Sequence, residues 1–206
     1  MEHIMLAAQV IFHPVDFCAL IKRKREKLGA APIIVILLLT ALCRLARVYF
    51  THYPLNSSPP EKSNILLLLA ILFVPVFSWV VGAYSTTTLM SGEVKFSELL
   101  TAGVYGYIPY IITTPVFIAV SHLLSGQSTT LFQILGVGVV IWMVIYQFIC
   151  FMSLNDYGFL KSLWVGALSV VAVLLLWAVL LLFFVFIYQM VVFAGELIVE
   201  MRSRGL

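Results

Sequence analysis

Apolar residues occur along this chain in five long runs, which are separated by short polar segments. Each run reaches about 20 residues, the length that a helix needs to cross the hydrocarbon core of a bilayer. None of them alternates with the two-residue period of a membrane β-strand. The pattern therefore predicts an all-α polytopic membrane protein, a five-transmembrane-helix bundle with spans at about residues 31–50, 65–90, 99–124, 131–154 and 163–186.

The fifth apolar run is longer than one span and extends from Leu163 to Gly195. A straight helix of that length would measure about 50 Å, whereas the hydrocarbon core is about 30 Å thick. We therefore expect the chain to pass beyond the membrane or to bend after about Phe184. The remainder, to about residue 200, is predicted to form a tail helix at the outer side of the membrane.

Residues 1–30 carry too many charges to span and are predicted to form a cytoplasmic leader with a short amphipathic helix. Phe17, Leu20 and Ile21 share one helical face, and a basic cluster occupies the others. That cluster consists of Lys22, Arg23, Lys24, Arg25 and Lys27. We expect it to bind anionic lipid headgroups and to anchor the leader; docking of a cytoplasmic partner is the alternative. Residues 31–206 form the membrane domain.

The distribution of lysine and arginine predicts the orientation, because cytoplasmic loops carry more of both. With the N-terminus inside, the inner segments hold the basic cluster together with Lys95 and Lys161. The outer segments then hold only Lys62, Arg202 and Arg204. We expect a multi-pass protein of the cell (cytoplasmic) membrane, with the N-terminus in the cytoplasm and the C-terminus outside.

Composition agrees with a membrane protein and excludes other classes. Apolar residues make up 63% of the 206 positions and charged residues 10%, whereas soluble domains contain about 45–50% and 25%. The net charge is +3. The chain has no second basic face with interleaved aromatic residues, so nucleic acid is not expected as a partner. Cys18, Cys43 and Cys150 have neither metal-ligand spacing nor a secreted disulfide pattern. We expect them to be buried thiols.

The stretch SGEVKFSELLTAGVYGYIPY, residues 91–110, places a polar turn before the third span. Ser97 is a possible helix cap, although Leu100 stands where a capping box would have an acid. Gly103, Gly106 and Pro109 follow at three-residue spacing, which allows a neighbouring helix to approach closely and the span to kink. The serines of this turn have no histidine base nearby. No catalytic, cofactor or metal site is expected.

Ionisable residues at membrane depth are the exception to this apolar pattern. Arg44 lies about 20 Å past the start of the first span, and Arg47 follows one turn later. A charge at that depth is costly unless it is paired or reaches the interface. Glu196 and Glu200 are candidate partners, because the predicted topology places them on the same side. Snorkelling of the arginines to headgroups is the alternative.

Four segments together resemble the YIP family, the five-span Ypt/Rab-interacting-protein domain, in its prokaryotic branch. They are FHPVDF, SGEVKFSELLTAGVYGYIP, NDYGFLKSLWVG and YQMVVFAGELIVE, in that order, and the resemblance covers about residues 12–200. It implies five spans with the N-terminus inside and the C-terminus outside. The eukaryotic members carry a longer soluble leader that this chain lacks, so a small-GTPase partner is doubtful.

We expect a non-enzymatic membrane protein that acts as a scaffold or accessory subunit, with the lipid bilayer and other membrane proteins as partners. No small-molecule substrate or cofactor is inferred. A permease or channel-like component is the alternative, using the hydroxyl run at residues 85–91 and the kinked third span. Such hydroxyls more often bond to carbonyls of their own helix, which is the interpretation we prefer. An intramembrane enzyme ranks last.

Overall fold

The computed structural model describes residues 13–23, 30–51, 64–90, 92, 94–123 and 129–203. Every regular element in these ranges is an α-helix. Five helical segments are long and apolar enough to cross a membrane, and the short helix α2 (Pro14–Arg23) precedes them. The predicted fold class, five spanning helices with a short N-terminal helix, is confirmed.

The spanning segments follow the apolar runs of the sequence. They are α3 (Ala30–Phe50), α4 (Ile65–Leu89), α5 (Phe96–Tyr105) with α6 (Ile108–Leu123), α7 (Thr129–Leu154) and α8 (Phe159–Ser203). The start of α4 is fixed by Asn64, whose side-chain oxygen accepts the backbone N–H groups of Leu66 at 3.0 Å and Leu67 at 3.3 Å. Such an N-cap satisfies N–H groups that have no partner within the helix.

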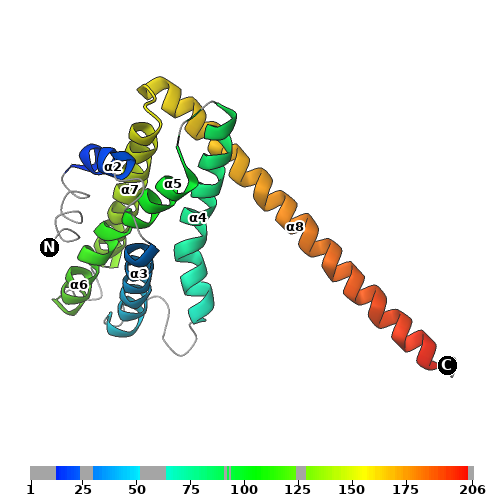
Figure 1. Ribbon diagram of the computed structural model, residues 1–206. Helices are drawn as coiled ribbons and strands as arrows, with labels where there is room; N and C mark the ends of the chain where they lie inside the picture. Colours follow the sequence, from blue (N-terminus) through cyan, green and yellow to red (C-terminus); the bar gives the residue numbers. More distant parts are fainter. Residues whose placement is uncertain are drawn as a thin grey trace.

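The short helix α5 occupies the centre of the bundle (Figure 1). It packs against α2, α3, α4 and α7, and seven of its ten residues are buried. The core around it combines aromatic and aliphatic side chains, among them Phe17, Val80, Leu99, Tyr105, Tyr146 and Phe151. The outer faces of α3, α4 and α7 expose apolar side chains instead, as expected of surfaces that face lipid.

The first part of α8 packs on α4 through small residues. A methyl group at Gly82 would lie 2.4 Å from Val173 Cγ2 and 2.9 Å from the carbonyl oxygen of Ser169, so only glycine allows this approach. The hydroxyls of Thr86 and Ser169 are hydrogen-bonded across the contact. Small residues and hydroxyl pairs of this kind are common where transmembrane helices meet.

The rest of α8 leaves the bundle as a straight helix (Figure 1). We call residues 177–196 the distal part of α8; each of these residues is exposed. Of the two alternatives for this run, the bend after Phe184 is wrong, because α8 is continuous from Phe159 to Ser203. Sharp kinks need a proline, a Gly/Ser pair or an inserted group, and this range contains no proline. Passage of the helix beyond the membrane stays a prediction.

Candidate functional site

The polar turn at residues 91–95 leads into α5 through a cap that the sequence analysis assigned to the wrong residue. The N-cap is Lys95, and Ser97 lies inside the helix. The Lys95 N–H donates to Glu98 Oε2 at 3.1 Å, so Glu98 supplies the acid of a capping box. Glu98 is only 3% exposed. Its carboxylate is tolerated in the core of the bundle because it is hydrogen-bonded to the backbone at the start of the helix.

The third span is broken between α5 and α6, at Gly106 and Tyr107. A methyl group at Gly103 would lie 2.8 Å from Val80 Cγ2 of α4, and one at Gly106 would lie 2.5 Å from Gln147 Nε2 of α7. The two glycines thus admit one neighbouring helix each. Pro109 lies in the first turn of α6, where its missing N–H removes no helical hydrogen bond.

Side chains of the protein bind carbonyl groups at this break. The N–H of Tyr107 donates to Val104 at 3.1 Å instead of continuing the α-helical ladder to Gly103. The Gly103 carbonyl accepts Gln147 Nε2 of α7 at 2.9 Å. The Tyr107 hydroxyl donates to the Leu72 carbonyl at 2.7 Å, within one turn of Pro75 in α4. Non-helical backbone at membrane depth is tolerated when protein groups bind it in this way.

Arg47 and Arg44 lie one turn apart on α3 and have different surroundings. The Arg47 guanidinium carbon lies 4.4 Å from the centroid of the Phe117 ring and 5.9 Å from that of Phe132. Cation–π attraction of this kind is worth about 2 kcal/mol when it is desolvated. Arg44 Nε is buried and has no hydrogen-bond partner among the described residues, and the same is true of the Tyr110 hydroxyl.

Both arginines line a cavity of about 1040 Å³ between α3, α4, α6, α7 and the start of α8. Its other polar lining residues are Thr51, Tyr110, Gln133 and Gln147, and the remainder of the wall is apolar except for backbone groups. None of the lining residues is acidic. The cavity therefore combines two positive charges with a hydrophobic wall.

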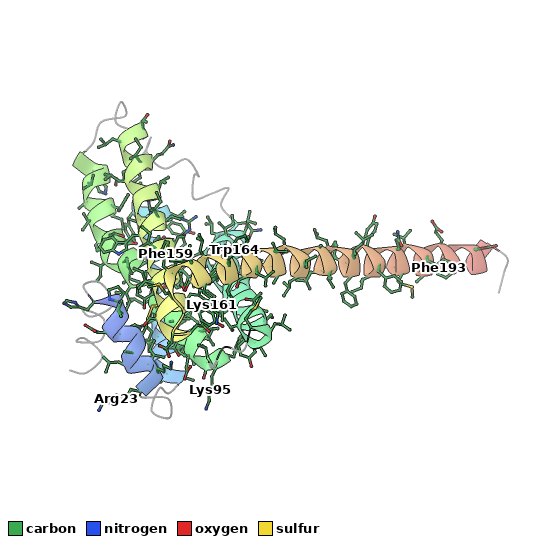
Figure 2. The ribbon with its side chains drawn as sticks, turned by 90° about the horizontal axis from the view of Figure 1, so that it is seen from above. Arg23, Lys95, Phe159, Lys161, Trp164 and Phe193 are labelled. Atoms are coloured by element: carbon green, nitrogen blue, oxygen red, sulfur yellow. A yellow bond between two sulfur atoms is a disulfide. The ribbon has the colours of Figure 1, made fainter. Side chains whose placement is uncertain are left out.

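The structure does not bring the predicted acidic partners to these arginines. Glu196 and Glu200 are exposed and lie toward the C-terminal end of α8, which points away from the bundle (Figure 1). Figure 2 shows the same separation: Phe159 and Trp164 lie beside the bundle, whereas Phe193 lies far along α8. In this conformation aromatic rings, not carboxylates, contact Arg47, because α8 stays straight where a bend was expected.

The leader helix α2 packs onto the bundle, against α5 and α7. Phe17 and Ile21 are 1% and 2% exposed, and the Phe17 ring lies 4.9 Å from the ring of Tyr105 in α5. Burial of each side chain contributes about 1.5–3 kcal/mol relative to exposure to water. Lys22 forms an ion pair with Asp156 in the turn between α7 and α8.

Lys22 therefore has a partner within the protein, and binding of the basic cluster to lipid headgroups stays a prediction. Arg23 is exposed and stays a candidate for that role. Lys24, Arg25 and Lys27 lie outside the described residues.

A disulfide joins α2 to α7, between Cys18 and Cys150, whose Cα atoms are 5.7 Å apart. The expectation of three free thiols is wrong for these two residues and right for Cys43. Both bonded residues are 1% exposed. Their separation of 132 positions along the chain explains why spacing gave no indication of the pairing.

The hydroxyl run of α4 bonds mainly to its own helix, as predicted. Ser85 donates to Val81, and Thr87 and Thr88 both donate to Tyr84, at 2.8–3.0 Å. Thr86 also reaches Ser169 of α8. These hydroxyls therefore bind backbone carbonyls of α4 and, at Thr86, the hydroxyl of Ser169 in α8.

Comparison with known protein families identifies the family of this chain. The Yip1 domain family matches residues 8–181, well over half of the chain. The chain belongs to this family. The resemblance seen in the sequence is thereby confirmed at the level of the family. No curated protein and no solved structure matches the chain.

Several residues that organise this Yip1 domain were not singled out by the sequence analysis. Gln147 interrupts an apolar run, which is a usable signal because a polar amide at membrane depth needs a partner. Asp156 has a positive φ of 52°, and Asp in a short turn between two apolar helices is typical of that conformation. Tyr110 gave no comparable signal, since tyrosines occur throughout the chain.

Replacement of Gln147 by leucine should destabilise the protein, because the Gly103 carbonyl would lose its partner at the break. An unsatisfied buried acceptor costs about 1–3 kcal/mol. Gln133 lies on the same helix and lines the same cavity but is exposed, so Gln133→Leu should change stability by less than about 0.5 kcal/mol. Thermal unfolding of both variants in one mild detergent tests this. Equal melting temperatures would show that the break does not depend on Gln147.

Proposed function

We propose that this Yip1-family protein is a non-enzymatic scaffold or accessory subunit of a membrane protein assembly. The observation that carries the proposal is the distal part of α8, in which every residue is exposed although all but Gln189, Gly195 and Glu196 are apolar. Figure 2 shows this part extending well beyond the bundle, with side chains on all sides.

The length of α8 supports a protein neighbour for its distal part. The apolar segment Phe159–Glu196 contains 38 residues and measures about 57 Å. To lie entirely within a core of about 30 Å it would need a tilt of about 60°, beyond the usual range of about 0–40°. Packing against neighbouring helices sets the tilt of a span. Among the described residues, α4 provides such packing up to Trp177, whose Nε1 donates to Ser78 at 3.2 Å, and the residues that follow, 178–196, are all exposed.

The side chains of the distal part are suited to contact with another membrane protein. Exposed aromatic residues occur repeatedly along it, at Phe183, Phe184, Phe186, Tyr188 and Phe193. Aromatic side chains are enriched at protein–protein interfaces, where they bury large areas at low entropic cost. The alternative is that lipid alone surrounds the distal part. In that case no neighbouring helix would set the tilt of α8.

We further propose that the N-terminus is cytoplasmic and the C-terminus lies outside the cell membrane. Contacts join the leader and the two predicted inner turns at one end of the bundle: Lys22 pairs with Asp156, and the Tyr157 hydroxyl donates to the Met90 carbonyl at 3.4 Å. Lys95 and Lys161 belong to the same turns, so the basic residues gather where the positive-inside rule expects the cytoplasm. The Cys18–Cys150 disulfide is unusual for that side, but its burial shields it from thiols.

A permease or channel-like component is the second candidate, and the cavity with Arg44 and Arg47 is the observation that favours it. Transporters place binding sites at broken helices near the middle of the membrane. At the α5–α6 break, however, the carbonyl of Gly103 is bound by Gln147, and Tyr107 binds α4. Because these side chains already occupy polar backbone groups at the break, we rank transport second.

A photoreactive phenylalanine analogue at Phe183 or Phe186 should form protein adducts in native membranes, since both positions lie on the distal part of α8. The same analogue at Phe50, which is 63% exposed on α3, is the matched control and should give lipid adducts only. Gel mobility and mass spectrometry distinguish a second copy of this chain from a different protein. Lipid adducts alone at all three positions would contradict the scaffold proposal.

Labelling of single cysteines tests the proposed orientation. In a background with all three native cysteines replaced by serine, Arg23→Cys should react with a membrane-impermeant maleimide only after lysis. Glu200→Cys should react in intact cells, because α8 carries it to the opposite side. The reverse pattern would invert the orientation, and labelling of both residues from one side would rule out an odd number of spans.

A further inference from the structure

The cavity described above is divided along its length into a polar and an apolar part. Arg47 on α3, Thr51 directly after α3, and Gln133 on α7 line one end, where α3 ends and α7 begins. A methyl group at Gly136 would lie 3.3 Å from Arg47 Nη2, so the guanidinium lies level with Gly136. The α7 residues that line the wall continue from there to Phe148.

The apolar part has the length of one lipid leaflet. From Gly136 to Phe148, α7 rises about 18 Å, and half of a bilayer core measures about 15 Å. This part of the wall includes Pro75, Trp79, Val140, Val144, Leu163 and Val170, with Gln147 at its end, where that side chain is bound to the Gly103 carbonyl. The total volume of about 1040 Å³ lies at the upper end of the range for ligand pockets, about 300–1,000 Å³.

The polar part is suited to an anion. Arg44 and Arg47 both line it, and no acidic residue belongs to the lining. Arg47 is held by the rings of Phe117 and Phe132, which leaves its charge uncompensated by any carboxylate among the lining residues. An uncompensated cation in a low-dielectric region is costly, and a bound anion would offset that cost.

Two buried donors provide an independent indication of a ligand. Arg44 Nε and the Tyr110 hydroxyl lack hydrogen-bond partners among the described residues, and both residues line the cavity. Tyr110 is only 5% exposed, so water outside the protein does not satisfy its hydroxyl. Buried polar groups are hydrogen-bonded in the great majority of structures, and a ligand with acceptor oxygens in this cavity would supply partners for these two donors.

We propose that this cavity binds one anionic phospholipid. Its phosphate is bound by Arg44 and Arg47 with a hydrogen bond from Tyr110, and an acyl chain lies along the apolar wall formed by α4, α7 and α8. A soluble anion would use the polar part only and leave the apolar wall without a role. A zwitterionic lipid would fit the wall but would supply less net charge to the arginines.

The test uses the full chain, delipidated in mild detergent, and two lipids with identical acyl chains, phosphatidylglycerol and phosphatidylcholine. Native mass spectrometry measures retained lipid, and thermal unfolding measures the stabilisation that each lipid gives. Phosphatidylglycerol should bind at least tenfold more tightly than phosphatidylcholine, because both lipids carry the phosphate but the choline of phosphatidylcholine adds a positive charge that the two arginines repel. Arg44→Gln with Arg47→Gln should abolish this preference, and Lys95→Gln, at an exposed site outside the cavity, should preserve it.

Tyr110→Phe keeps the ring and removes only the hydroxyl, so it tests the site even if the double arginine variant fails to fold. It should weaken phosphatidylglycerol binding several-fold, because the phosphate loses one hydrogen bond. Equal binding of the two lipids by the unaltered protein would overturn the proposal. Stabilisation by inorganic phosphate equal to that by phosphatidylglycerol would also overturn it, in favour of a soluble anion. Unchanged phosphatidylglycerol binding in both variants would overturn the assignment of the residues.

Discussion

Within the hydrocarbon core of a membrane, each backbone N–H and carbonyl must find its partner inside the protein. In four spans of this Yip1 domain a continuous helix meets that requirement. The third span is interrupted, and the hydrogen bond from Gln147 to the Gly103 carbonyl binds the interruption to α7. This allows α5 to lie in the centre of the bundle, where α2, α3, α4 and α7 pack around it.

The two ends of the bundle differ in how tightly their helices are packed. At the end that holds the leader, the disulfide, the Lys22–Asp156 ion pair and the buried ring of Phe17 join α2 to its neighbours. Toward the other end α3, α4 and α7 separate enough to leave the cavity that Arg44 and Arg47 line. The same chain therefore has a tightly packed end and an end that is open to a ligand.

The sequence was sufficient to predict features that depend on neighbouring residues. Apolar runs predicted the five spans, and Gly103, Gly106 and Pro109 indicated where the third one is interrupted. Features that depend on the rotation and depth of two distant helices were not predictable. The contact of Arg47 with Phe117 and the pairing of Cys18 with Cys150 belong to this class. Bilayer thickness left two alternatives for the fifth apolar run, a bend after Phe184 or passage beyond the membrane, and the continuous helix α8 excludes the bend.

The position of α8 relative to the bundle is the most direct test of this account. Spin labels at Tyr49→Cys on α3 and Tyr188→Cys on α8, both exposed, can be measured by electron paramagnetic resonance in lipid nanodiscs after the native cysteines are replaced by serine. Tyr188 lies about 22 Å along α8 from Val173, the residue in contact with Gly82. The account predicts a separation greater than about 20 Å, because α8 leaves the bundle there. A separation near the roughly 10 Å of packed helices would show that α8 folds back onto α3, and would contradict it.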